Sequence, residues 1–276
     1  MLHRRAPHTR ERLAAVFWAE YPAQIARKYL RQNLWRLRQA LESIGTPAND
    51  YLGCNDEEIA FTGAGSYWLD IEIFETTLTR YQNIAGEALT TEQAGQLEEA
   101  MALYTGDLLE GLYEDWCLLE RERLRILYLN GLNKLMTFHA FHRNYERGLA
   151  YGERILTFDK VREKVHRQMM QLYWLLGDRA AALAQFRRCV QILQEELVVP
   201  PMPETECLYQ QMVSNQYPAS LSLVNLSHPA ELSQLRPELV EQTLQRIRQL
   251  RATVEAVKTE LDALESLLNP FSSGTG

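Results

Sequence analysis

The chain has 276 residues, of which 46% are hydrophobic and 24% are charged, and it carries a formal net charge of −7. These totals suit a soluble protein of one or two domains. No run of the sequence approaches the roughly 18 apolar residues that a membrane-spanning helix needs. The first residues lack the apolar core of a signal peptide. We therefore expect a cytoplasmic protein without a membrane partner.

The charge is distributed unevenly along the chain. Residues 1–45 hold nine Lys or Arg and three Glu, a net charge of +6, which leaves −13 for the rest of the chain. A basic end on an acidic body indicates one local anionic partner rather than a surface that binds anions everywhere. The basic residues concentrate in "ARKYLRQNLWRLRQALE", residues 26–42.

Two helices are predicted at this basic end. The segment "TRERLAAVFWAE" (9–20) begins with Thr9, a residue typical of helix N-caps, and continues with apolar residues. After the break "YPAQ", residues 26–42 follow a helical period. On a wheel of 100° per residue their apolar side chains fall within one narrow stripe. That stripe consists of Ala26, Leu30, Leu34, Leu37 and Leu41.

The opposite side of the same helix carries cationic, amide and aromatic groups. Its residues are the candidate DNA-binding residues: Arg27, Lys28, Arg31, Gln32, Trp35, Arg36 and Arg38. Lys and Arg neutralise phosphates, while Arg and Gln can read base edges in the major groove. A solvated helix face is the alternative interpretation of such a pattern.

The only strand-like part of the sequence is 51–70. There "EIAF" and "SYWLDI" flank the turn-rich "TGAG", which predicts a β-hairpin. A short helix, a tight turn, a basic helix and a hairpin together predict a winged helix-turn-helix. Helices are expected to resume near 70 and to continue to about 213.

An internal repeat lies within these later helices. "RNYERGLAYGERIL" begins at residue 143 and "GDRAAALAQFRRCV" begins at residue 177. The offset between them is about 34 residues, which is the helix-turn-helix period of tetratricopeptide repeats. Each segment follows another predicted helix, and the small residues Gly148 and Ala182 occupy equivalent positions. Ordinary helical hairpins with accidental spacing are the alternative.

The last predicted helix, 237–269, has an apolar heptad pattern typical of a coiled coil. The residues predicted to pair helices are Val240, Ile247, Leu250, Val254, Val257, Leu261 and Leu264. In a parallel pair Arg246 would face Arg251, whereas an antiparallel pair brings Arg246 to Glu260. We therefore predict antiparallel pairing in a homodimer, and docking of this helix on its own chain remains the alternative.

No arrangement of residues indicates catalysis, a cofactor or a metal. His139 and His142 lie three residues apart, and neither they nor His166 have a partner with metal-ligand spacing. The four cysteines are far apart and form no CxxC motif, so a reduced protein without a zinc site is expected. The sequence "GAGS" (63–66) is too short for a phosphate loop. We predict that the protein is not an enzyme.

The basic end resembles the winged-helix domain of Streptomyces antibiotic regulatory proteins. That family has an "reeLa..LWp" helix followed by "Ar..Lr..l.rLRr.L", and residues 10–18 match its first part. The matches to its second part are Ala26, Arg27, Leu30, Arg31, Leu34, Arg36, Leu37, Arg38 and Leu41. The segment "YWLDIEIFE" (67–75) is similar to the family's exit from the wing.

The body of the chain resembles the bacterial transcriptional activation domain. In "YTGDLLEGLYEDWCLLERERLR" (104–125) the matching residues are Tyr104, Gly106, Asp107, Leu109, Trp116, Glu120, Arg121 and Leu124. Residues 161–197 are similar to its "E..hr.LM.ly...G.r..AL" run, and "PETECL" (203–208) is similar to its closing motif. The resemblance implies a domain that supports self-association or contacts the transcription machinery.

We thus expect a mainly α fold with four parts. They are a winged helix-turn-helix segment at 1–75, a tetratricopeptide-like activation domain at 76–213, a linker at 214–236 and a coiled-coil helix at 237–269. The family's winged helix starts with a small sheet and a further helix, and only about ten residues precede residue 10 here. We therefore expect a shortened winged helix. The expected function is transcription regulation on double-stranded DNA, and the alternative is a protein-interaction adaptor that has lost DNA binding.

Overall fold

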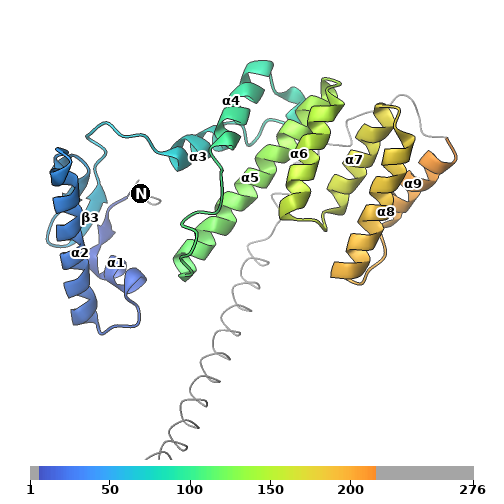
Figure 1. Cartoon of the computed structure of the whole chain (residues 1–276). Coiled ribbons are helices and arrows are strands. Elements are labelled where there is room, and N and C mark those ends of the chain that lie inside the picture. The colour runs from blue at the N-terminus through green and yellow to red at the C-terminus, as the bar shows by residue number, and fades with distance from the viewer. Residues whose placement is uncertain (1–5, 216–276) are drawn as a thin grey trace, which may run out of the picture. The chain divides into compact units, whose positions relative to one another are not determined.

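The computed structural model describes residues 6–215, and Figure 1 shows them as a mainly helical chain with one small sheet. The predicted linker lies almost entirely outside these residues, and the predicted coiled-coil helix with its pairing residues lies wholly outside them. The elements are β1 (His8–Thr9), α1 (Arg10–Phe17), α2 (Ala23–Ser43), η1 (Ala48–Asp50), β2 (Leu52–Cys54), β3 (Glu58–Phe61), α3 (Asp70–Arg80), η2 (Gly86–Ala88), α4 (Thr91–Ala102), α5 (Asp115–Phe141), α6 (Tyr145–Phe158), α7 (Glu163–Leu175), α8 (Arg179–Glu196) and α9 (Pro203–Val213).

Both helices predicted at the basic end are present. The hydroxyl of Thr9 accepts a hydrogen bond from the backbone N–H of Arg12, as a helix N-cap does. α1 ends at Phe17, three residues before the predicted end. α2 begins at Ala23, three residues before the basic segment, because the Pro22 carbonyl accepts the first helical hydrogen bonds, from the N–H groups of Ile25 and Ala26.

A hairpin is present, but the prediction of one of its two strands is wrong. β3 is the expected "EIAF", but its hairpin partner is β2 before it, and residues 62–69 after it form no strand. The reason is a side-chain turn, because Asn55 Oδ1 accepts hydrogen bonds from the N–H groups of Glu57 (2.9 Å) and Glu58 (2.5 Å). An asparagine that binds the backbone two and three residues ahead reverses the chain there.

The strand-like residues are also not confined to 51–70. β1 pairs antiparallel with the free edge of β3, opposite Ile59 and Glu58, so the sheet has the order β1-β3-β2. The first strand thus leads directly into α1, and the wing is attached to the start of the helix-turn-helix. A two-residue strand has too little alternation to be recognised from the sequence.

A small core joins α1, α2 and the sheet. Its buried residues are Ala14, Ala26, Leu30 and Ile59, with Leu13, Trp18, Leu34 and Cys54 packed against them. The predicted apolar stripe of α2 is buried at Ala26 and Leu30 and only partly buried at Leu34 and Leu41. Leu37, predicted to be buried, is 46% exposed.

Helices continue from Asp70 to Val213, as predicted, and α5 to α9 each pack on the next one (Figure 1). α6 begins at Tyr145 and α8 at Arg179, with the same offset as the two repeated sequence segments. Each follows a residue in the left-handed conformation, Arg143 (φ 59°) and Gly177 (φ 80°), and these two residues are separated by that offset as well. The local backbone geometry therefore recurs at the spacing found in the sequence.

Two glycines allow close packing in this region. A Cβ on Gly86 would lie 2.6 Å from the carbonyl oxygen of Lys134, so only glycine lets η2 approach α5 this closely. A Cβ on Gly148 would lie 3.0 Å from Leu172 and 3.4 Å from the carbonyl oxygen of Met136. α6 thus approaches both α5 and α7 through Gly148, the small residue that the repeat pattern singled out.

Candidate nucleic-acid interface

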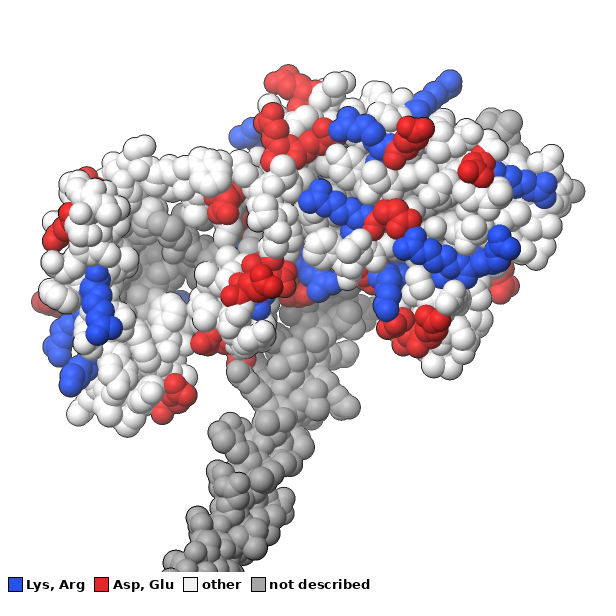
Figure 2. All heavy atoms as spheres, in the orientation of Figure 1, with Lys and Arg blue, Asp and Glu red and all other residues white. Residues whose placement is uncertain are grey.

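The cationic side of α2 is exposed. Six of its seven candidate residues are open to solvent: Arg27, Lys28, Arg31, Gln32, Trp35 and Arg36. The indole of Trp35 is 62% exposed. In Figure 2, blue Lys and Arg side chains lie over this helix, whereas blue and red side chains alternate over the later helices. The face therefore offers cations, an amide and an aromatic ring to a partner.

Arg38 differs from the other candidates. It is half-buried, and its Nε is buried with no hydrogen-bond partner within the described residues. On the helical wheel it lies beside Leu34, at the boundary between the two faces. Its guanidinium is thus less available to a partner than those of Arg31 and Arg36.

Most of the cations on this face are not neutralised. Arg27 lies 3.5 Å from the carboxylate of Glu11 on α1, but both side chains are more than half exposed, so the pair is weak, about 0–1 kcal/mol. Lys28, Arg31 and Arg36 form no ion pair within residues 6–215. Their positive charge is therefore available to an anion.

The wing has the opposite charge. The turn between β2 and β3 is Asn55, Asp56 and Glu57, and Glu58 follows as the first residue of β3. All three carboxylates belong to this turn or adjoin it, and Asp56 and Glu57 are exposed. This acidic turn was not predicted, because the turn signal "TGAG" indicated a hairpin turn further along the chain. An Asn followed by three acidic residues beside "EIAF" was the available signal.

The aromatic end of α1 is partly covered. Trp18 packs against the small core and Tyr29, and the Phe17 ring lies 5.5 Å from the ring of Trp116 on α5, in an edge-on arrangement. Such pairs contribute about 0.5–1.5 kcal/mol beyond the area they bury. Phe17 nevertheless remains 48% exposed.

The later helices hold two buried histidines with hydrogen-bond partners. His139 Nε2 lies 2.8 Å from Glu98 Oε1, which also accepts hydrogen bonds from Arg147 (2.8 Å) and Tyr151 (2.9 Å). Burial lowers the pKa of His139, and the bond to Glu98 opposes this only in part. Burial alone would raise the pKa of Glu98, but its three hydrogen bonds outweigh burial and lower it. Glu98 therefore ties α4 to α5 and α6 as an anion.

The second buried histidine, His166, has partners on both ring nitrogens. Nε2 lies 2.9 Å from the Lys160 carbonyl oxygen, and Nδ1 lies 2.8 Å from the side-chain nitrogen of Gln185. A neutral ring that donates from Nε2 and accepts at Nδ1 satisfies both contacts. Burial accordingly lowers the pKa of His166.

Neither histidine lies in a cluster of metal-ligand residues within the part of the chain that the structure describes. The described residues contain no group of three or more His, Cys, Asp or Glu placed to hold a metal ion. The four cysteines are free thiols. Within residues 6–215, no helix combines the length and the apolar composition that crossing a membrane requires.

An exposed cationic helix in a helix-turn-helix, followed by packed helices without a metal cluster among the described residues, is an arrangement typical of transcription regulators. Comparison with known proteins supports this class. The family model named bacterial transcriptional activator domain matches residues 69–213, more than half of the chain. The chain belongs to this family, and the resemblance of its body to the bacterial transcriptional activation domain is confirmed.

Among the solved structures that match, one covers most of this chain. It is Mycobacterium tuberculosis EmbR in complex with a low-affinity phosphopeptide, with a TM-score of 0.66 and 18% sequence identity. The similarity covers 82% of this chain and 59% of that one, so this chain corresponds to little more than half of EmbR. At this identity the likeness establishes the fold. A search of the curated proteins found no match.

Proposed function

We propose that this protein is a DNA-binding transcription regulator of the Streptomyces antibiotic regulatory protein type, and that α2 enters the major groove. The observation that carries the proposal is the exposed face of α2, where Lys28, Arg31 and Arg36 have no ion-pair partner within the described residues. Phosphates would supply the missing anions, and Gln32 is exposed on the same face to contact base edges.

The wing would contribute little to this complex. Asp56 and Glu57 are exposed at its turn and would be repelled by phosphates. Recognition would therefore depend on α2, with the groove-facing set Arg27, Lys28, Arg31, Gln32, Trp35 and Arg36. Arg38 belongs to the predicted set as well, but it is half-buried and would contribute less than the exposed residues.

Residues 76–213 would form a tetratricopeptide-like activation domain. The matching starts of α6 and α8 and the left-handed residues before them, both separated by one repeat length, support this inference. The domain would support self-association or contact the transcription machinery. Antiparallel pairing of 237–269 in a homodimer and a shortened start of the winged helix remain predictions.

Fluorescence anisotropy on duplex DNA tests the DNA-binding proposal. We expect log affinity to fall with log salt with a slope of about −2.7 to −3.6, since each neutralised phosphate contributes about −0.9 and three or four cations are available. The double variant Arg31→Ala/Arg36→Ala should bind at least about tenfold more weakly at low salt. Arg80→Ala/Arg187→Ala is the matched control, because both arginines are exposed on later helices and the net charge changes equally.

A protein-interaction adaptor is the second candidate function. Two features favour it: the acidic wing, which phosphate repels, and the exposed Leu37 of α2 and Ile44 just after it, which a protein partner would bury. Absence of DNA binding at low salt by a folded chain would make the adaptor the better explanation. Equal losses of binding in the two double variants would refute a specific role of α2.

A further inference from the structure

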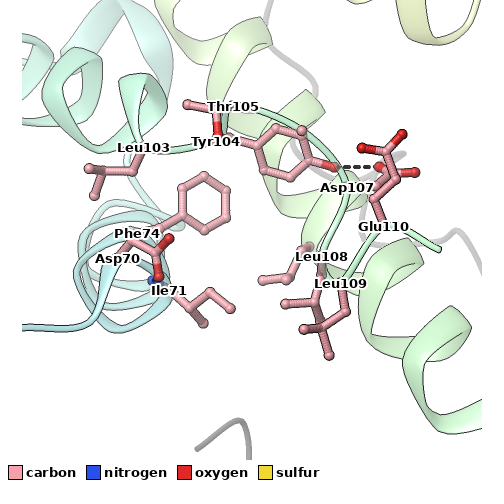
Figure 3. Close-up of a pocket in the computed structure, with 12 residues that line it drawn as sticks. Asp70, Ile71, Phe74, Leu103, Tyr104, Thr105, Asp107, Leu108, Leu109 and Glu110 are labelled. Atoms are coloured by element: carbon pink, nitrogen blue, oxygen red, sulfur yellow. Dashed lines mark hydrogen bonds between the residues drawn. The ribbon is translucent and has the colours of Figure 1, made fainter. Parts of the chain in front are cut away.

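A hollow of about 350 Å³ opens between α3, the connection from α4 to α5, and α5. Its apolar lining comes from Ile71, Phe74, Leu103, Leu108, Leu109 and Leu124. Figure 3 shows Ile71 and Phe74 of α3 on one side, facing Leu108 and Leu109 of the connection across the open space. The volume lies within the range of small-molecule sites, about 300–1,000 Å³.

All the charged residues that line the hollow are acidic. Asp70 comes from the first turn of α3, and Asp107 and Glu110 come from the connection. No Lys or Arg lines it, and none of the three carboxylates forms an ion pair within residues 6–215. Arg121, which approaches from α5, donates hydrogen bonds to the carbonyl oxygens of Leu108 (2.5 Å) and Leu109, and so holds the connection in place.

Aromatic rings add a second feature suited to a cation. Tyr104 and Phe74 both line the hollow, with ring centroids 5.8 Å apart, and Tyr104 stacks on Tyr128 at 4.1 Å. The Tyr104 hydroxyl donates to Asp107 Oδ1 at 3.3 Å. Burial, with help from Asp107, raises the pKa of Tyr104 to about 12, so the hydroxyl keeps its proton and orients the carboxylate. Aromatic faces attract ammonium groups.

We propose that this hollow binds a small organic cation with an apolar body, such as an alkylammonium compound. The ammonium group would lie beside Asp107 and Glu110, and the apolar body would lie against Ile71, Phe74 and Leu108, toward Asp70 on the opposite side. Apolar walls favour the body of the ligand, and unpaired carboxylates exclude anions from the same space. All the lining residues lie within residues 69–213, which the family model matches, and the site does not depend on DNA binding by α2.

Isothermal titration calorimetry on the purified full chain tests the proposal with n-hexyltrimethylammonium as the probe. The neutral 1-hexanol and the anionic hexanoate carry the same alkyl chain and serve as comparators. We expect the cation to bind about tenfold or more tightly than hexanol, and hexanoate to give no saturable heat. Added salt should weaken the binding of the cation, because Asp107 and Glu110 are exposed.

The double variant Asp107→Asn/Glu110→Gln assigns the binding to this hollow. Each exposed ion pair contributes up to about fivefold, so together the two substitutions should weaken binding of the cation by about tenfold. Asp56→Asn/Glu99→Gln makes the same chemical changes at exposed positions outside the hollow, and should leave binding unchanged. Circular dichroism checks that each variant is folded.

Three results would overturn the proposal. They are the absence of saturable binding of the cation, equal affinities for the cation and for hexanol, and wild-type affinity in the Asp107→Asn/Glu110→Gln variant. The first two are measured on the unaltered chain, so they remain decisive if a variant fails to fold.

Discussion

The winged-helix segment and the later helices bury their apolar side chains to very different degrees. The largest side chains with less than 2% exposure all lie between Leu97 and Met212. In the described residues before Asp70, the buried core contains mostly small side chains, and Phe17, Trp35, Leu37 and Ile44 are exposed. Since burial of apolar area is the main source of stability, the later helices should hold most of it.

This difference in burial indicates that the two regions have different roles. A packed interior keeps the helices after residue 70 in one arrangement, with polar contacts such as the Glu98 cluster joining them. The winged-helix segment instead leaves cationic and apolar groups of α2 at its surface, where a partner can bury them. Its stability should depend more strongly on what it binds.

The largest expected effect is on stability, at Leu132. This side chain of α5 is fully buried, so Leu132→Ala should lower the free energy of unfolding by about 2–5 kcal/mol. Leu37→Ala on α2 is the matched change at an exposed leucine and should stay within about 0.5 kcal/mol. Urea unfolding followed by circular dichroism measures both. If Leu37→Ala lowered the free energy of unfolding as much as Leu132→Ala, another element would have to bury Leu37. The two regions would then not differ in burial as described.

The next effect is a loss of stability in acid, which comes from two histidines of the later helices. Burial lowers the pKa of His139 and His166 in the folded chain. As the pH falls through 6.5, the unfolded chain therefore takes up protons first, and the free energy of unfolding decreases. Glu98 has a lowered pKa, so its contribution is lost only below pH 4.5. Between pH 7.5 and 5.5 the histidines should dominate.

The variant His139→Gln tests the origin of this pH dependence. Glutamine can still donate a hydrogen bond to Glu98 but does not titrate. We expect the decrease in unfolding free energy between pH 7.5 and 5.5, measured in urea, to become smaller without disappearing, because His166 remains. An unchanged pH dependence in the variant would show that His139 is not a source of it.

Local signals account for the parts of the fold that the sequence predicted. Thr9 begins a helix because its hydroxyl binds the N–H of Arg12, and that requires only neighbouring residues. The spacing of the repeat was visible because equivalent turns need equivalent residues. The strand partner of "EIAF" was mistaken because two turn signals compete there, and the side chain of Asn55 forms the hairpin turn.

Features that depend on distant contacts could not be predicted in this way. Glu98 forms hydrogen bonds with His139, Arg147 and Tyr151, which are 41 to 53 residues away in the sequence. No local sequence pattern predicts these contacts. The hollow beside α3 likewise combines residues near 70, 105 and 124. Helical periodicity placed Leu37 on the apolar stripe, but periodicity alone does not tell whether another element covers it.

The smallest effect concerns the charge contrast between α2 and the wing. If DNA is bound by α2 alone, the exposed Asp56 and Glu57 of the wing repel the phosphates and lower the affinity for DNA. Asp56→Asn/Glu57→Gln should then raise the affinity for duplex DNA by roughly threefold at low salt, a gain that salt screens away. Asn55 stays in place, so its hydrogen bonds to the backbone of the turn are retained. Weaker DNA binding in this variant would mean that the acidic turn contacts the DNA complex favourably, and that the wing takes part in recognition after all.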